Sequence, residues 1–221
     1  MKTFIIHLSK IESSLESAVK LQNDLKLIDI NAELFEGTYG SDAEQIFKQE
    51  NRKIHGINFK GNAIDDRGII KAQRPGVMGC FYSHYRLWKK CVELNETICI
   101  FEDDVKIVRR LEPVEFEDVL VVALGAVKRK KNAQYLENPV GFPRAENYEN
   151  ASMPGTVGYM ITPRGAKKLL DHYKNTYIAS DNAMNQAVIK IQIHSHLVGE
   201  ANLAKQSLTK TTKFWDSFKH E

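Results

Sequence analysis

The sequence is poor in cysteine, carries little net charge and contains no long hydrophobic run. Its three cysteines, Cys80, Cys91 and Cys99, show no CxxC spacing, so neither a disulfide framework nor a zinc ribbon is indicated, and we expect buried thiols. A formal charge of +3 is too small to indicate nucleic acid as a partner. The apolar segment 4–8 is followed at once by polar and charged residues, so we expect a cytoplasmic protein without a signal sequence or membrane span.

The positive charge that is present gathers in two stretches. One is the run of four basic residues at 128–131, and the other is the C-terminal tail. Such runs are typical of solvated loops, and they also suit contact with an anionic partner such as a diphosphate, a phosphorylated glycolipid or an anionic membrane surface. The sequence leaves both interpretations open. The lysines that make the tail basic are Lys205, Lys210, Lys213 and Lys219.

Strand-like and helix-like segments alternate along the chain, which predicts an α/β fold with a mostly parallel central sheet flanked by helices. With 221 residues and 43% hydrophobic content, the chain is expected to form a single domain over 1–221. Ligands of such sheets collect at the carboxyl ends of the strands. We expect strands at 4–8, 32–36, 97–101, 119–124, 157–161 and 189–196. A capping box at 13–16 predicts the start of a first helix. Further helices are expected at 42–49, at 79–94, after an N-cap at Thr162, and from Asp181.

Two long connections, at about 51–75 and 126–155, show little hydrophobic periodicity. Loops of this length in a compact domain are usually lids, binding loops or disordered segments. We interpret 126–155, which contains the basic run, as a segment that closes over a donor or an acceptor; only its length and charge support this hypothesis.

Three consecutive carboxylates, Glu102, Asp103 and Asp104, follow directly after the apolar strand expected at 97–101. Adjacent like charges cost free energy unless a cation or hydrogen bonds offset them, and Mg²⁺ or Mn²⁺ would do so. Such an ion would also bridge the two phosphates of a nucleotide sugar and stabilise a diphosphate leaving group. Along an extended chain Glu102 and Asp104 share a side while Asp103 points elsewhere. The alternative is a charged surface turn.

The acidic triplet becomes more specific when it is combined with the helix that precedes it. That helix contains Gly79-Cys80-x-x-Ser83-His84, and the triplet is followed by Val105. These two motifs, in this order and separation, resemble the signature of glycosyltransferase family 25, the lipopolysaccharide and lipooligosaccharide glycosyltransferases. The later segments 158–161 and 165–170 are similar to the family's later strand and Gly-Ala helix. The first strand departs from the pattern, because the family usually has Asn, Asp and Arg after it where this chain has 7–10, His-Leu-Ser-Lys.

The resemblance implies a GT-A-like fold, a nucleoside-diphosphate sugar donor such as UDP-galactose, and a growing bacterial glycolipid or oligosaccharide as acceptor. A protein that acts on such an acceptor would be cytoplasmic or peripheral at the inner face of the inner membrane. Glu102 and Asp104 would take the part of the DxD motif and hold Mn²⁺ or Mg²⁺. The residues expected to line the donor or acceptor pocket are Gly79, Ser83, His84, Glu102 and Asp103, with Ser83 and His84 near the start of their helix.

Several of these residues also have structural interpretations. His84 could equally be a hydrogen-bonded core histidine. His194 and His196 share one face of a predicted strand, so one of them could be a third metal ligand, as GT-A enzymes often have; an exposed polar strand face is the alternative. Asp181 is the candidate general base for an inverting transfer, with Asp104 as the other catalytic carboxylate, but Asp181 would also serve as a helix N-cap. If Asp181 is only a cap, the base would lie among Asp65, Asp66 and Glu146.

Two other classes of function remain alternatives. A metal-dependent nucleotidyltransferase or phosphatase would also place an acidic cluster after a strand, but the sequence has no GxxxxGK[ST] loop and no early strand that ends in Asp-x-Asp. A non-catalytic carbohydrate-binding protein of the same fold is the second alternative, against which the intact acidic triplet argues.

Overall fold

The structure, a computed structural model, describes residues 1–50, 55–56, 70–125, 153, 155–194 and 196–201. Within this part of the chain, an eight-stranded sheet has the order β2-β1-β4-β7-β6-β10-β5, and β9 also pairs with β6. The strands are β1 Lys2–His7, β2 Ala32–Glu36, β4 Ile98–Glu102, β5 Val105–Ile107, β6 Val119–Leu124, β7 Thr156–Ile161, β9 Ile191–Ile193 and β10 Gly199–Ala201; β3 His55–Gly56 pairs separately with β8 Thr176–Tyr177. The helices are α1 Glu12–Lys26, α2 Gly40–Gln49, α3 Ile70–Leu94, α5 Pro163–His172 and α6 Ser180–Ala183.

The predicted α/β class is confirmed, with one topological feature that the sequence did not reveal. In the large sheet, β1 pairs in parallel with β2 and β4, and β6 pairs in parallel with β9 and β10. Strand β7 lies antiparallel between β4 and β6, and β5 lies antiparallel to β10. The parallel pairings therefore outnumber the antiparallel ones by four to three, and the insertion of β7 brings a late segment of the chain beside β4.

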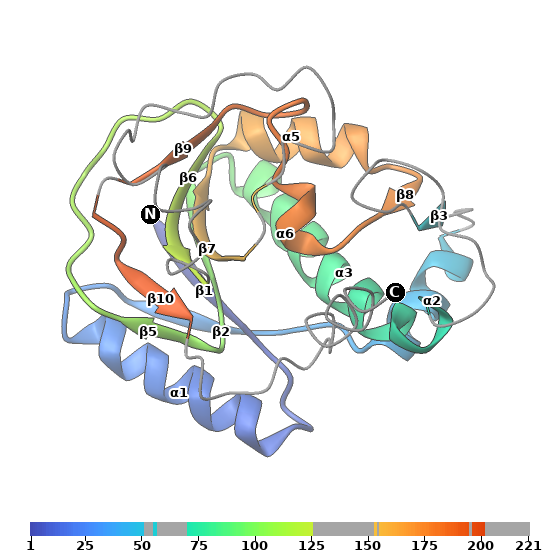
Figure 1. The fold of residues 1–221 in the computed structure, drawn as a ribbon, viewed down its shortest axis with the longest axis horizontal. Helices are drawn as coiled ribbons and strands as arrows, with labels where there is room; N and C mark the ends of the chain where they lie inside the picture. Colours follow the sequence, from blue (N-terminus) through green and yellow to red (C-terminus); the bar gives the residue numbers. More distant parts are fainter. Residues whose placement is uncertain (51–54, 57–69, 126–152, 154, 195, 202–221) are drawn as a thin grey trace, which may run out of the picture.

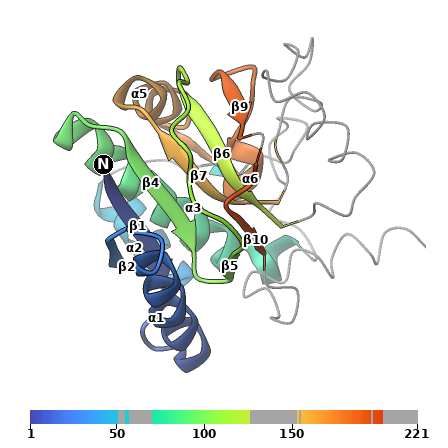
Figure 2. The same ribbon diagram turned by 90° about the vertical axis from the view of Figure 1, so that its left-hand side faces the viewer.

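Helices cover both faces of the sheet, so the molecule has three layers (Figures 1 and 2). Alternate residues of a strand point to opposite faces, and β4 shows this clearly. Ile98 and Ile100 pack into the core that includes α3 and α5, whereas Cys99 and Phe101 pack into the second core, under α1. The next residue on the α3 side is Glu102. The alternation of β4 thus directs the first carboxylate of the acidic triplet toward α3.

Helix α3 differs from its prediction in length and in one core position. Phe81 and Trp88 are fully buried as expected, but Val92 is exposed and Cys91 takes its place in the core. The helix begins at Ile70 rather than near Gly79, and it contains Pro75. A Cβ on Gly40 would overlap the backbone of Pro75, so the start of α2 packs directly on this early part of α3. Tertiary packing here outweighs the local signal of a proline, which ordinarily marks a helix boundary.

Two other local predictions were wrong and one was right. Helix α1 begins at Glu12 after Ile11, with no capping bond from a side chain; Ser14 instead accepts a hydrogen bond from the Leu8 amide at 2.9 Å. The strand expected at 189–196 is limited to β9, because its edge pairs with β6 over only three residues. Thr162 is the N-cap of α5 as predicted, since its hydroxyl accepts from the Gly165 amide. Of the long loop expected at 51–75, residues 70–75 are helical, and most of 126–155 lies outside the described residues.

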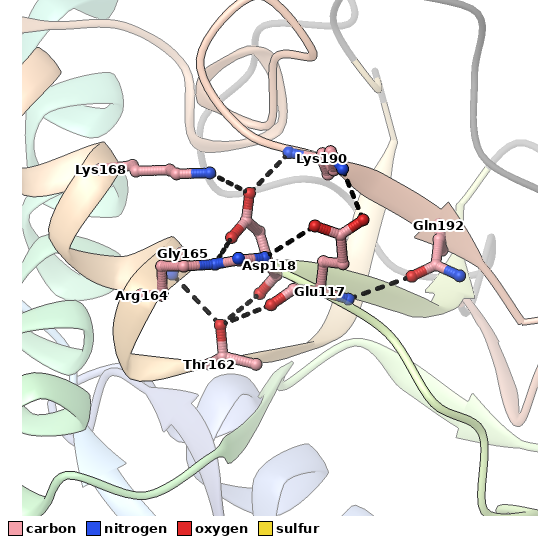
Figure 3. A network of polar contacts seen from close by, with 8 residues as sticks. All are labelled: Glu117, Asp118, Thr162, Arg164, Gly165, Lys168, Lys190 and Gln192. Atoms are coloured by element: carbon pink, nitrogen blue, oxygen red, sulfur yellow. Dashed lines mark hydrogen bonds and ion pairs between the residues drawn. The ribbon is translucent and has the colours of Figure 1, made fainter.

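The buried side chain of Asp118 connects the start of β6 to α5 and to the segment before β9 through hydrogen bonds (Figure 3). The fully buried side chain of Asp118 accepts hydrogen bonds from Arg164 Nε at 2.8 Å, from Lys168 Nζ at 2.6 Å and from the Lys190 amide at 2.9 Å. Its backbone carbonyl accepts from the Thr162 amide, and a Cβ on Gly165 would collide with the same carbonyl. The glycine therefore permits the close approach on which this network depends.

Within the described part of the chain, no helix combines the length and the apolar character needed to cross a membrane.

Candidate functional site

The acidic triplet lies at the carboxyl end of β4, where the strand gives way to a turn. Glu102 is the last strand residue, and Asp103 and Asp104 form the turn that leads into β5. All three side chains are partly exposed. The prediction that Glu102 and Asp104 share a side assumed an extended chain through Asp103. The assumption was wrong, because the chain turns at Asp103. The position at a strand's carboxyl end is the one that parallel sheets use for ligands.

His84 links this carboxylate to the core. It lies in the middle of α3, not near the helix start as predicted, and its side chain is 2% exposed. Its Nδ1 is 2.9 Å from the Tyr159 hydroxyl and its Nε2 is 3.3 Å from Glu102 Oε1. Of the two interpretations of His84, the structure thus supports the hydrogen-bonded core histidine. Its Nε2 thus faces the candidate metal ligand Glu102.

The direction of the hydrogen bonds follows from the donors. Trp88 Nε1–H can only donate, and it does so to the Tyr159 oxygen at 2.8 Å. Tyr159 stays protonated, because burial raises its pKa well above the usual value, and its hydroxyl can donate a hydrogen bond to His84 Nδ1. The remaining ring proton is then on Nε2 and points to Glu102. With Tyr159 as the donor to Nδ1, the order of donation is Trp88 to Tyr159 to His84 to Glu102.

The electrostatics of His84 agree with this assignment. Burial lowers the pKa of His84 to about 4, an effect that the nearby Asp181 only partly opposes, so the imidazole is neutral at pH 7. Burial raises the pKa of Glu102 to about 8; Asp181 and Asp103 act in the same direction, while a hydrogen bond from Ser180 lowers it. Both neighbouring charges that act on Glu102 are carboxylates. A cation bound at this point would relieve their mutual repulsion.

Asp181 comes from α6, far along the chain, and lies close enough to interact with the charge of Glu102. It is not the N-cap of α6, as the structural interpretation expected, because Ala179 has that position and makes no capping bond from its side chain. Instead, Asp181 Oδ2 accepts a hydrogen bond from the Gly155 amide at 2.9 Å. Burial raises the pKa of Asp181, against hydrogen bonds from the backbone amides of Gly155 and Asn182. The structure thus brings the candidate base together with the acidic turn.

Gly79 and Ser83 contact the protein's own backbone. Ser83 is buried; its hydroxyl donates to the Gly79 carbonyl at 2.7 Å and accepts from the Thr38 amide at 2.8 Å. A Cβ on Gly79 would collide with the carbonyl of Thr38. Both residues therefore hold the turn between β2 and α2 against α3. A contact of Ser83 or Gly79 with a donor or acceptor stays a prediction.

The two late histidines differ from each other. His194 is buried, its Nδ1 accepts from the His196 amide at 3.0 Å, and its Nε2 lies 3.0 Å from the carbonyl of Glu112. Both ring nitrogens of His194 are therefore engaged by backbone groups. The side chain of His196 is exposed, because β9 ends at Ile193 and the chain no longer alternates as a strand there. The expected common strand face does not form, and neither histidine joins the cluster of ligand atoms around Glu102 among the described residues.

Sequence reasoning missed two members of the site, Cys80 and Ser180. Cys91 and Cys99 are fully buried as predicted, but Cys80 is only partly buried. Its Sγ lies 3.1 Å from the Ser180 hydroxyl, and it shares a helix face with His84 one turn away. The spacing Cys80-x-x-x-His84 in the sequence was the available signal for this placement.

The turn after β1, where the sequence departs from the family pattern, is held by residues of β2 and its following loop. Glu36 accepts from the Ser9 amide at 3.1 Å and lies 3.8 Å from His7 Nε2. The Tyr39 hydroxyl accepts from the Lys10 amide at 2.8 Å. The chain thus retains an ordered turn at this place without Asn, Asp and Arg.

Comparison with known proteins places these observations in a family. The profile of glycosyltransferase family 25, described as LPS biosynthesis protein, matches residues 1–184. Procollagen galactosyltransferase 1-A of Xenopus laevis is 36% identical over 107 residues, which are 43% of this chain and 17% of that protein. Procollagen galactosyltransferase 1-B of the same organism is 29% identical over 181 residues, 77% of this chain and 28% of that protein. Lipooligosaccharide biosynthesis protein lex-1 of Haemophilus influenzae is 27% identical over 163 residues, 65% and 51% of the two chains.

The matched regions span about half or less of these relatives' lengths. The family profile, in contrast, covers most of this chain and includes the motif helix α3, the acidic turn after β4 and Asp181. The chain belongs to glycosyltransferase family 25.

Proposed function

We propose that this chain transfers a hexose, galactose, from a UDP-sugar to a hydroxyl of a lipopolysaccharide or lipooligosaccharide acceptor, with inversion at the anomeric carbon. The observation that carries the proposal is the position of Asp181 near the acidic turn at the carboxyl end of β4. The hydroxyl of Ser180, the residue before Asp181, lies 3.1 Å from the Cys80 sulfur, and that sulfur lies within 4.8 Å of a Glu102 oxygen. Galactose as the sugar is supported by the names of the two procollagen galactosyltransferases, and the glycolipid acceptor by the name of the lipooligosaccharide biosynthesis protein. Such an acceptor would place the protein in the cytoplasm, peripheral to the inner face of the inner membrane.

The residues at the turn suit a hard divalent cation. Glu102, Asp103 and Asp104 offer carboxylate oxygens, which Mg²⁺ and Mn²⁺ prefer. Burial, and after it the charges of Asp181 and Asp103, raise the pKa of Glu102, and a cation would offset the repulsion among these carboxylates. We assign Glu102 and Asp104 as the metal ligands, and Asp103 beside them as a residue that contacts the sugar donor. The ion, when bound, would neutralise negative charge on the departing diphosphate.

The protein's own side chains have separate tasks in this scheme. His84 holds Glu102 through its Nε2–H. Asp181 accepts the proton of the acceptor hydroxyl as that oxygen attacks, since an inverting transfer needs a base on the face opposite the leaving group. Asp181 is suited to this role because its raised pKa makes it a stronger base than an exposed carboxylate.

The proposal is tested by following UDP release from UDP-galactose with Mn²⁺ and a glycolipid acceptor. EDTA should abolish release reversibly, and Asp104→Asn should lower kcat at least about 100-fold, because removing a ligand sacrifices several kcal/mol of charge stabilisation. Asp42→Asn, the same change at an exposed position of α2, is the matched control and should keep full activity. Full turnover in EDTA after removal of all metal would refute the metal assignment, and hydrolysis of nucleotides without sugar transfer would favour a phosphoryl-transfer enzyme.

A further inference from the structure

Three side chains next to the proposed donor site present three different kinds of metal ligand to one another. The Cys80 sulfur, a His84 ring nitrogen and a Glu102 oxygen all lie within 4.8 Å of one another. We propose that these residues form a binding site for Zn²⁺, distinct in its ligands from the oxygen site for Mg²⁺ or Mn²⁺. Because Glu102 belongs to both sets, zinc would compete with the ion that the transfer uses.

The backbone already places the ligands correctly. Cys80 and His84 are four residues apart on α3, so their side chains lie one above the other on one helix face. The same i, i+4 spacing holds two zinc ligands in the helical HExxH motif. Glu102 approaches from the end of β4, on the sheet face that α3 covers. One helix face and one strand end therefore supply all three ligands.

The distance between His84 and Glu102 fits a tetrahedral ion. Zinc binds imidazole nitrogen and carboxylate oxygen at about 2.0–2.2 Å, so two such ligands on a tetrahedral ion are about 3.3–3.6 Å apart. His84 Nε2 and Glu102 Oε1 are 3.3 Å apart. The Cys80 sulfur lies within 4.8 Å of both other ligand atoms and would move toward the ion to form a Zn–S bond of about 2.3 Å. The fourth position would be left to water or to a neighbouring oxygen.

The buried side of the site supports the histidine in its metal-bound form. A metal takes the lone pair of Nε2, and the ring proton then resides on Nδ1. The Tyr159 oxygen lies 2.9 Å from Nδ1. Once the hydroxyl hydrogen of Tyr159 turns away from the ring, this oxygen can accept a hydrogen bond from Nδ1–H, and metal-bound histidines usually have such an outer partner. On binding, the Cys80 thiol gives its proton to water and its sulfur becomes the anionic ligand.

The ligand set selects zinc over the ions expected at the acidic turn. Thiolate and imidazole favour Zn²⁺, whereas Mg²⁺ and Mn²⁺ favour oxygen ligands. Cys80 is partly exposed, so an ion can reach it from solvent. In contrast, Cys91 and Cys99 are fully buried in the two hydrophobic cores, and they serve as internal comparisons.

The binding test uses the full chain without any sugar donor, so its outcome is independent of the transferase activity. Zn²⁺ binding is measured by equilibrium dialysis, and Co²⁺ serves as a probe because a cobalt–thiolate bond gives a near-ultraviolet charge-transfer band. We expect one ion per chain and a band in the wild type. Cys80→Ser should abolish the band and weaken zinc binding at least about 100-fold, the upper end of what loss of an outer partner alone costs. Cys99→Ala should retain both, with circular dichroism confirming the fold of each variant.

A second measurement needs no variant. With free zinc at about ten times its Kd, alkylation of Cys80 in the wild type should slow about tenfold, because only the unoccupied fraction reacts. Mass spectrometry reads Cys80 separately from Cys91 and Cys99. Absence of stoichiometric zinc, an unchanged band in Cys80→Ser, or alkylation of Cys80 that zinc does not slow would each overturn the proposal. Inhibition of transfer by zinc, tested afterwards, rests on the proposed function, and the binding result does not.

Discussion

Glu102 is oriented by buried rings that lie behind it. Trp88, Tyr159 and His84 are each at most 2% exposed, and each has its polar atom hydrogen-bonded within the chain that leads to Glu102. An ordered chain of this kind fixes the tautomer of the histidine. Glu102 therefore receives a hydrogen bond from a ring that cannot easily turn away, and the position of the carboxylate is determined from inside the core.

Replacing Tyr159 with Phe removes the middle of this chain. We expect unfolding to become easier by about 1–3 kcal/mol, because buried polar groups of Trp88 and His84 lose their partner. We also expect kcat to fall with little change in KM, since His84 would no longer be held in the tautomer that donates to Glu102. Chemical denaturation and steady-state kinetics measure the two effects.

Tyr82→Phe is the matched control for that change. Tyr82 is also buried on the core side, but its hydroxyl donates to Glu50 at 3.1 Å instead of to His84. It should affect stability without lowering kcat. If Tyr159→Phe lowers stability and leaves kcat unchanged, the chain of rings supports only the fold.

Asp181→Asn separates a chemical role of Asp181 from a structural one. The asparagine oxygen can still accept the Gly155 amide proton, but the amide cannot take a proton from an acceptor. We expect kcat to fall about 10²- to 10⁴-fold. Because the folded pKa of Asp181 is raised, its ionised form destabilises the fold as pH rises, so the neutral variant should be at least as stable as the wild type at pH 7.

The comparison for this variant is Asp171→Asn, at an exposed position of α5, which should alter neither activity nor stability. Near wild-type turnover by Asp181→Asn would show that the residue only anchors Gly155. The base would then have to be sought at Asp65, Asp66 or Glu146, which lie outside the described residues.

At the scale of elements, the network around Asp118 joins three segments that are separate in the sequence. Burial acts to raise the pKa of Asp118, but hydrogen bonds from Lys168, the Lys190 amide and Arg164 outweigh it and hold the pKa below its usual value. The charged form is thus favoured in the folded state. This network lies at the start of β6, whereas the acidic turn lies at the end of β4, so it contributes to stability and not to the site.

Asp118→Asn should therefore destabilise the protein by about 1.5–3 kcal/mol, the range for hydrogen bonds to charged groups. A depressed folded pKa contributes stability that is fully present above the unfolded pKa of about 3.9 and is lost as pH falls through the folded value. The difference between wild type and variant should accordingly be constant near pH 7 and shrink in acid below about pH 4. Urea denaturation at several pH values measures it.

Glu117→Gln is the control for this network, since Glu117 pairs with Arg164 and Lys190 at the exposed surface and should change stability less. A difference for Asp118→Asn that stays the same down to strongly acid pH would contradict the electrostatic explanation.

The sequence predicted elements well where one local signal agreed with the tertiary structure. The buried strands β4 and β6 fall within a residue of their predicted bounds, and the cap at Thr162 forms. Prediction from the sequence failed where packing between distant segments determines how an element begins. Ser14 bonds the Leu8 amide rather than opening a capping box, and α3 continues back through Pro75 because α2 packs on it. No periodicity in a single segment contains that information.

At the scale of the whole molecule, the motifs predicted the acidic turn and His84 but not how they meet. Their contact depends on the antiparallel insertion of β7, which places Tyr159 opposite Ile100 and within reach of α3. Asp181 reaches the acidic turn because it lies on α6. The family resemblance indicated an acidic residue in this late region of the chain, but not its position in the fold. The sequence predicts a buried thiol at Cys80, whereas the structure places the Cys80 sulfur beside Ser180, His84 and Glu102.

A site assembled from α3, β4 and α6 should bind donor and metal together and stabilise the entire fold when it does. At a ligand concentration about 100 times Kd, binding to the folded state adds about 2.7 kcal/mol. For a chain of this size that corresponds to a rise in Tm of about 5–10 °C. We expect this rise with UDP-galactose plus Mn²⁺, a smaller one with UDP-glucose or with either component alone, and none with GDP-mannose. Thermal denaturation followed by fluorescence measures it, with Asp104→Asn as the variant that should lose the contribution of Mn²⁺. An equal rise with GDP-mannose would contradict a uridine donor, and an unchanged Mn²⁺ effect in Asp104→Asn would remove that residue from the metal site.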